Sequence, residues 1–178
     1  MSSFIDLPHL GCPDLKVAFD PSWTTSEKIR GGLRQILPEA CLKNSPPTAS
    51  GFSVSLSHCP EGGLIAYCPN KDLSTVGVDI EVTSRINEKT VARISSQNEM
   101  AKSSDYRALW VGKEAVFKAL WPNNEGLVVG DISVDSWTLN GPNFRLFTAL
   151  CRGEKISGMG FVSIREHCHF SIFLQTSL

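Results

Sequence analysis

Residues 105–121 have the hydrophobic pattern of a buried helix. The stretch contains no proline and one glycine, and Pro122 follows it. When its residues are spaced at about 100° each, apolar side chains cover more than half of the circumference. A helix with apolar side chains nearly all round is packed inside a protein. The segment therefore predicts a central, buried helix.

The charged residues of this predicted helix share one arc with its aromatic residues. The arc contains Arg107, Trp110, Lys113, Glu114, Phe117, Lys118 and Trp121. A buried carboxylate is costly unless it meets a cation, a metal ion or strong donors. Glu114 therefore either faces a ligand-binding cleft or pairs with Lys118 one turn further along the helix. The helix alone fits both interpretations.

Residues 52–59 alternate between apolar and polar positions, which predicts a strand with two different faces. Ser53, Ser55 and Ser57 share the polar face, and His58 stands at the end of the strand. Hydroxyl and imidazole groups suit contacts with phosphate or ribose. We therefore interpret Ser57 and His58 as ligand-binding residues, with an ordinary loop histidine as the alternative for His58.

Residues 75–82 form a second alternating strand, in which Gly77, Asp79 and Glu81 share one face. Residues two apart on a strand are about 6.5–7 Å apart with side chains on the same side. Two carboxylates at this spacing repel each other unless a cation lies between them. Gly77 beside them leaves room for a ligand to approach the backbone. An exposed edge strand carrying two acids is the alternative.

Residues 25–37 predict a helix with a Thr25 or Ser26 cap. Its basic residues, Lys28, Arg30 and Arg34, form either a solvated face or a clamp for phosphate.

The rest of the chain divides into two halves. A loop-like segment at residues 69–75 predicts a boundary, so that the halves comprise residues 1–72 and 73–178. Residues 87–102 have a helical pattern, and several strands follow the central helix. Asn140 and Gly141 predict a hairpin between the first two of these strands.

Composition narrows the function only by exclusion. The chain has 178 residues and a net charge of -1, so its charge points neither to nucleic acid nor to an anionic membrane. The first residues lack the pattern of an export signal, and no apolar run is long enough to span a bilayer. The six cysteines include no CxxC pair, which indicates reduced thiols rather than a disulfide framework or a zinc site. We expect a cytoplasmic protein.

The acidic residues of the strand and the helix together suggest a metal site. Asp79, Glu81 and Glu114, with Lys113 and Lys118 beside them, suit Mg²⁺ bound to a phosphate group. Such a site fits transfer at a pyrophosphate, where catalysis depends on positioning and charge stabilisation. The sequence has no GxxxxGK[ST] loop and no kinase signature, which disfavours ordinary NTPase chemistry.

Several of these segments together resemble a known family. GVDIE at 77–81, followed by WVGKEAVFK at 110–118, is similar to the signature pair of the 4′-phosphopantetheinyl transferase superfamily. SLSHC at 55–59 resembles the Ser-His segment of the larger, surfactin-synthetase-activating type. SSQNE at 95–99 and Gly126-Leu127 resemble further motifs of the family.

This resemblance implies an α+β fold of two pseudo-twofold-related halves, each a small sheet packed with helices, with coenzyme A between them. It also implies Mg²⁺-dependent transfer of 4′-phosphopantetheine to a serine of an apo acyl or peptidyl carrier protein, releasing adenosine 3′,5′-bisphosphate. Asp79, Glu81 and Glu114 would hold the metal. Glu114 or a water on the metal would accept the serine proton.

Phosphate binding is also implied for Lys113, Lys118 and His58, and the basic residues Lys28, Arg30 and Arg34 remain candidates for the 3′-phosphate. With both halves in one chain, we expect a monomer.

The sequence also departs from the family pattern. Val111 stands where a small hydroxyl or thiol residue is usual, and Glu125 where the larger type often has a basic residue. A degenerate member that binds coenzyme A or a carrier protein without turnover is therefore an alternative. A Mg²⁺-dependent nucleotide hydrolase is another.

Overall fold

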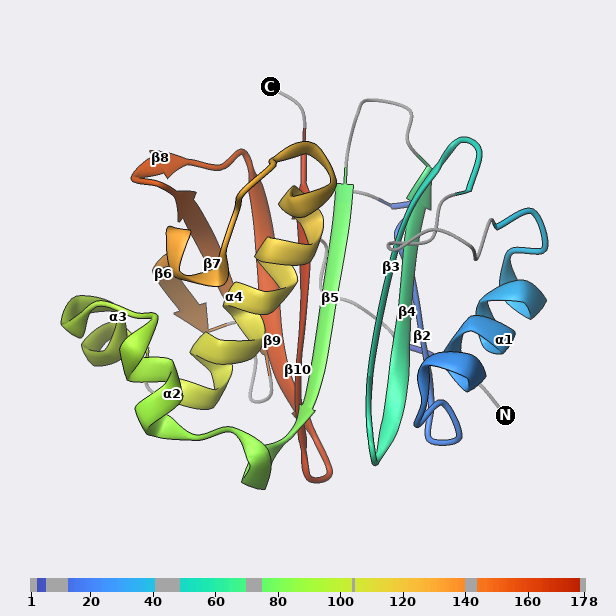
Figure 1. Cartoon of the computed structure of the whole chain (residues 1–178), viewed down its shortest axis with the longest axis horizontal. Coiled ribbons are helices and arrows are strands. Elements are labelled where there is room, and N and C mark those ends of the chain that lie inside the picture. The colour runs from blue at the N-terminus through green and yellow to red at the C-terminus, as the bar shows by residue number, and fades with distance from the viewer. Residues whose placement is uncertain are drawn as a thin grey trace.

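The computed structural model describes residues 3–5, 13–40, 49–69, 75–103, 105–139 and 144–176. It has the predicted α+β architecture, with two antiparallel sheets packed against a few helices (Figure 1). The first sheet uses residues up to Pro69 and the second begins at Thr75. The predicted boundary between residues 72 and 73 falls in a segment outside the described residues. The pseudo-twofold relation of the halves stays a prediction.

The first sheet has four strands in the order β1-β2-β4-β3. Its strands are β1 (Ser3–Phe4), β2 (Lys16–Asp20), β3 (Phe52–Cys59) and β4 (Gly62–Pro69). Helix α1 (Ser26–Ile36), which the sequence predicts, begins where the Thr25 side chain accepts the Lys28 N–H, and it packs on one face of this sheet. Ile29 and Leu33 are buried on this face, which fixes which side of α1 turns outward.

The second sheet follows the order β5-β10-β9-β7-β6, with β8 paired to β7. Its strands are β5 (Thr75–Val82), β6 (Ile132–Leu139), β7 (Phe144–Cys151), β8 (Glu154–Lys155), β9 (Gly158–Arg165) and β10 (Cys168–Gln175). β6 and β7 pair antiparallel, as predicted. The turn residues predicted between them, Asn140 and Gly141, lie outside the described residues.

Helix α4 (Tyr106–Leu120) is the predicted central helix, and most of its residues are buried against the second sheet. Where the sequence predicts one helix over residues 87–102, the structure has two, α2 (Glu88–Arg93) and α3 (Gln97–Lys102). The prediction missed the break because Ser96 starts a new helix with a capping box, in which Glu99 bonds back to the Ser96 N–H. Short 3₁₀ turns cover Thr83–Arg85, Trp121–Asn123 and Val129–Asp131.

Gly77 allows α4 to lie directly on β5. A Cβ at this position would collide with the Ala115 carbonyl and lie 2.6 Å from the Ala119 nitrogen. The prediction that Gly77 leaves room for a ligand is therefore wrong, because the helix backbone occupies that room. Because of this close approach, side chains of α4 lie next to side chains of β5.

The two sheets meet edge to edge at β3 and β5, and serine side chains connect them. The N–H groups of Val76, Val78 and Ile80 donate to the hydroxyls of Ser53, Ser55 and Ser57 at 2.9, 3.0 and 3.3 Å. The serine face of β3 therefore binds the β5 backbone. This differs from the interpretation of that face as a surface for phosphate or ribose.

None of the helices in the described part of the chain is long and apolar enough to cross a membrane. In that part of the chain, Cys59, Cys151 and Cys168 are free thiols.

Candidate active site

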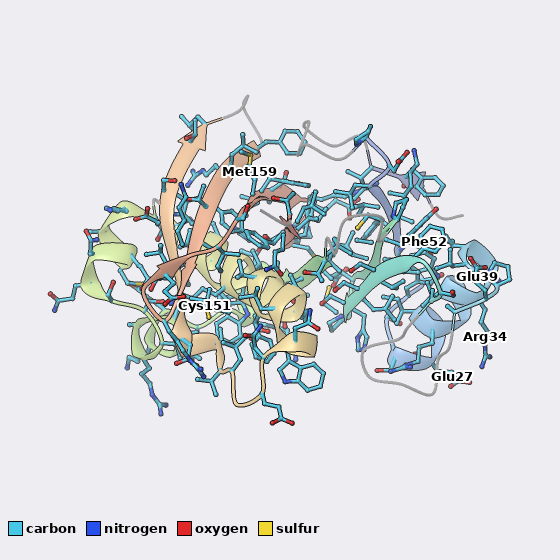
Figure 2. The ribbon with its side chains drawn as sticks, turned by 90° about the horizontal axis from the view of Figure 1, so that it is seen from above. Glu27, Arg34, Glu39, Phe52, Cys151 and Met159 are labelled. Atoms are coloured by element: carbon cyan, nitrogen blue, oxygen red, sulfur yellow. The ribbon has the colours of Figure 1, made fainter. Side chains whose placement is uncertain are left out.

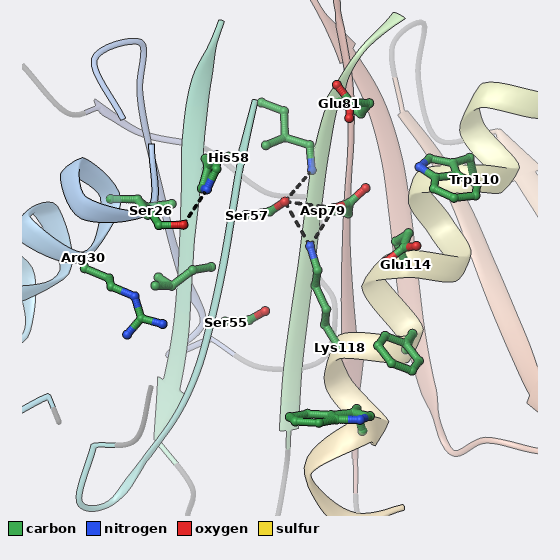
Figure 3. Close-up of a pocket in the computed structure, with 15 residues that line it drawn as sticks. Ser26, Arg30, Ser55, Ser57, His58, Asp79, Glu81, Trp110, Glu114 and Lys118 are labelled. Atoms are coloured by element: carbon green, nitrogen blue, oxygen red, sulfur yellow. Dashed lines mark hydrogen bonds and ion pairs between the residues drawn. The ribbon is translucent and has the colours of Figure 1, made fainter. Parts of the chain in front are cut away.

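A cavity of about 470 Å³ opens where the two halves meet (Figure 3). One wall comes from β5 and α4 and carries Asp79, Glu81, Glu114 and Lys118. The opposite wall comes from α1 and β3 and carries Ser26, Arg30, Ser55, Ser57 and His58. The cavity thus has carboxylates on one side and neutral or basic donors on the other.

Asp79 is the most tightly held of the three predicted metal ligands. Only 7% of its surface is exposed. Its Oδ1 accepts hydrogen bonds from Lys118 Nζ at 2.7 Å and from Ser57 Oγ at 2.8 Å. Ser57 also accepts from Lys118 Nζ at 3.0 Å, so the three side chains form a closed triangle (Figure 3). Lys118 thus pairs with Asp79 and not with Glu114.

Glu81 lies two residues further along β5 and also lines the cavity. Its Oε1 accepts the Val82 N–H at 2.8 Å and lies 3.5 Å from Arg85 Nη1. Within the described part of the chain, no three metal-ligating side chains are grouped closely enough to hold an ion. The donor set nevertheless fits a hard cation, because three carboxylates reach one cavity from two elements.

Glu114 faces the cavity from the middle of α4. Burial raises the pKa of its carboxyl group to about 7, the nearby Asp79 adds to the rise, and Lys118 opposes it. A carboxyl group with this pKa exchanges its proton near neutral pH. Glu114 is therefore suited to accept a proton or to bind a cation.

Lys113 does not line the cavity, although the sequence pattern grouped it with Glu114. Its side chain is fully buried and donates to the Ile94 carbonyl at 2.6 Å, with Glu99 Oε1 at 3.0 Å. Burial lowers the pKa of Lys113, and the hydrogen bond and charge of Glu99 oppose that change. Because Glu99 on α3 supplies a buried partner, Lys113 turns towards α3 and away from any phosphate in the cavity.

Of the three basic residues predicted on α1, only Arg30 lines the cavity. Lys28 is exposed, with its Nζ 3.4 Å from Thr24 Oγ1. Arg34 is exposed on the outer side of α1 (Figure 2). The predicted three-residue clamp is therefore reduced to Arg30, because the buried face of α1 is fixed by Ile29 and Leu33.

His58 closes this wall from the end of β3. Its Nε2 lies 3.0 Å from Ser26 Oγ at the start of α1, within hydrogen-bond distance. His58 is a ligand-binding residue predicted from the sequence, whereas Ser26 was not predicted to line the cavity. The cap pattern at Thr25 and Ser26 marked a helix start, and only the fold shows that this start faces the cavity.

The three aromatic side chains of the polar arc, Trp110, Phe117 and Trp121, line the cavity beside Glu114 and Lys118. Trp121 is 44% exposed and lies where α4 ends. These rings give the acidic wall an apolar rim.

The signature segments on this wall have a counterpart among known families. Residues 75–159 match the family model described as the 4′-phosphopantetheinyl transferase superfamily. The chain therefore carries a domain of this superfamily, which includes β5 and α4 with all the acidic residues of the cavity. No curated protein matches the chain significantly. The matched residues do not reach Ser26, Arg30 or His58 on the opposite wall.

Proposed function

We propose that this protein transfers the 4′-phosphopantetheine group of coenzyme A to a serine of an apo acyl or peptidyl carrier protein, releasing adenosine 3′,5′-bisphosphate. The observation that carries the proposal is the cavity between the halves. A wall of carboxylates and one lysine from the matched domain faces a wall with Arg30 and His58. This arrangement suits a substrate with a pyrophosphate and a separate terminal phosphate.

Asp79, Glu81 and Glu114 are the residues that would hold Mg²⁺ in this reaction. The bound ion would neutralise the pyrophosphate charge and so make the phosphorus easier to attack. Lys118 would bind a phosphate oxygen, since its side chain lines the cavity and is partly exposed. Lys113 has no part in this proposal.

The N-terminal wall would hold the nucleotide end of coenzyme A. Arg30 supplies a permanent charge, and His58 and Ser26 supply further hydrogen-bonding groups. The terminal 3′-phosphate is the part of the substrate that best fits a guanidinium group. Lys28 and Arg34 lie outside this contact.

Glu114 would assist the attacking serine. Its carboxylate faces the cavity and would accept the hydroxyl proton as the oxygen bonds to phosphorus. The leaving group then departs as adenosine 3′,5′-bisphosphate. Both walls come from one chain, so we expect the monomer to be active, and obligate trimers in sedimentation under assay conditions would contradict this.

The direct test is intact-mass measurement of several apo carrier proteins after incubation with coenzyme A, Mg²⁺ and the protein. The expected result is a mass increase equal to one phosphopantetheine group, which disappears when the carrier serine is replaced by alanine. Coenzyme A binding without any mass increase would instead support a binding protein without turnover. Phosphate release without a carrier would support a hydrolase.

A further inference from the structure

We propose that Lys118 is a resident cation of the metal site, so that Lys118 and a divalent metal ion compete for Asp79. This inference rests on the proposed function, because it concerns the same carboxylates. In the metal-free protein the ammonium group neutralises Asp79. A metal ion binds only as Lys118 leaves, and the pyrophosphate of the coenzyme gives Lys118 its new partner.

The geometry of Asp79 supports this competition. Asp79 is nearly buried, and its Oδ1 carries both the 2.7 Å contact with Lys118 and the 2.8 Å bond from Ser57. A nearly buried carboxylate needs a cation or strong donors in every state of the protein. An ion on that oxygen would lie next to the ammonium group, where like charges repel.

Ser57 makes the metal-free arrangement definite. Its hydroxyl donates to Asp79 and accepts from Lys118 and from the Ile80 N–H. One donor and two acceptor positions are thereby all in use. The hydrogen bond from the β5 backbone fixes the Ser57 hydroxyl, and this hydroxyl in turn keeps Lys118 next to Asp79.

Lys118 is able to leave Asp79 without unfolding the helix. Its side chain is 29% exposed and stands on the cavity side of α4, close to the end of the helix. Lys113 on the same helix is fully buried and has no such freedom. Of these two lysines, only Lys118 is able to alternate between a carboxylate and a phosphate in the cavity.

The consequence is that metal and coenzyme bind cooperatively. A metal ion alone must displace a charged hydrogen bond, and a coenzyme alone must draw Lys118 away from Asp79. When both bind, the metal ion replaces Lys118 as the partner of Asp79, and the coenzyme replaces Asp79 as the partner of Lys118. Loss of the Lys118 charge should therefore strengthen metal binding to the coenzyme-free protein and weaken the coupling between the two ligands.

The test measures Mn²⁺ binding to the coenzyme-free protein by electron paramagnetic resonance, with no carrier and no turnover. We expect Lys118→Gln and Lys118→Met to bind Mn²⁺ about tenfold more tightly than the wild type or better, because the competing charged hydrogen bond is absent. Lys102→Gln is the matched control, since it removes the same charge from an exposed lysine next to Asp135. It should leave Mn²⁺ affinity within about twofold.

Coenzyme A is then added to each protein. It should tighten Mn²⁺ binding by about tenfold or more in the wild type, and by clearly less in the Lys118 variants. Folding is checked by circular dichroism. Unchanged or weaker Mn²⁺ binding in both Lys118 variants, or no detectable binding at millimolar Mn²⁺, would overturn the inference.

These outcomes are separable from the proposed function. If carriers gain mass but the Lys118 variants bind Mn²⁺ no better, the competition is wrong and the transferase proposal stands. If no carrier gains mass but the variants bind Mn²⁺ more tightly, the competition stands and the transfer reaction is wrong.

Discussion

The two walls of the cavity differ in how their polar side chains are held. On the β5 and α4 wall, Asp79 is fixed by Lys118 and Ser57, and Glu81 by the Val82 N–H. On the α1 and β3 wall, His58 is exposed and contacts Ser26, itself an exposed residue at the start of α1. For the proposed transfer, we expect the fixed residues of the β5 and α4 wall to serve the chemistry, and the exposed residues of the other wall to set which ligand is accepted.

The largest expected effect comes from the fixed wall. Asp79→Asn should reduce carrier modification by about a thousandfold, because stabilisation of the pyrophosphate by the metal is worth several kcal/mol. The fold should remain intact, since asparagine still accepts a hydrogen bond from Lys118. Initial rates with labelled coenzyme A, together with melting curves, measure both quantities.

The matched control for Asp79 is Asp135→Asn, an exposed carboxylate on β6 paired with Lys102. It should modify carriers at the wild-type rate. Turnover near the wild-type value in Asp79→Asn would remove this wall from the reaction.

The next largest effect is a loss of stability at Lys113, a residue with no direct part in ligand binding. Lys113→Met leaves Glu99 buried without its cation and should lower the free energy of unfolding by about 3–5 kcal/mol. Urea titration measures this, and Glu99→Gln in the same chain should restore part of the loss. If Lys113 instead bound phosphate, the variant would keep its stability and lose affinity for coenzyme A.

The exposed wall predicts a smaller effect on affinity. Arg30→Ala should cost about 1.5–3 kcal/mol in coenzyme A binding, as expected for a charged hydrogen bond. Its affinity for dephospho-coenzyme A should change little. Arg34→Ala, one turn further along α1 and outside the cavity, is the control and should leave both affinities unchanged in calorimetry. Equal losses in both variants would mean that α1 acts only through its general charge.

The smallest effect concerns the pH dependence of stability. Between about pH 4.5 and 7, the native metal-free protein keeps a proton on Glu114 that the unfolded chain has released. The free energy of unfolding therefore falls as pH rises through this window. Glu114→Gln should remove this fall, so that at pH 8 the variant is more stable by about 1–3 kcal/mol.

Denaturant titrations at several pH values provide the measurement for Glu114→Gln. The advantage of the variant should vanish below about pH 4.5, and the exposed Glu125→Gln should show no advantage at any pH. A variant less stable than the wild type at pH 8 would mean that the Glu114 charge is favourable in the folded protein.

Periodicity predicted much of the fold and part of the cavity. The 3.6-residue pattern located α4, and the two-residue pattern located β3 and β5, so the sequence also showed that Asp79 and Glu81 share a side. The sequence could not show which other elements pack against each face of these strands and of the helix. The partner of Lys113 depends on how α3 packs on α4, and the partners of Ser53 and Ser55 depend on two sheet edges meeting.

The serine contacts between β3 and β5 also bear on aggregation. An uncovered strand edge carries unpaired N–H and C=O groups that can pair with another molecule. Here each half covers the edge of the other, and the hydroxyls of Ser53, Ser55 and Ser57 satisfy three β5 N–H groups. A chain cut between Pro69 and Thr75, with its halves separated, would expose both edges at once. The contact that forms the cavity is thus also what keeps foreign strands from pairing with β3 and β5.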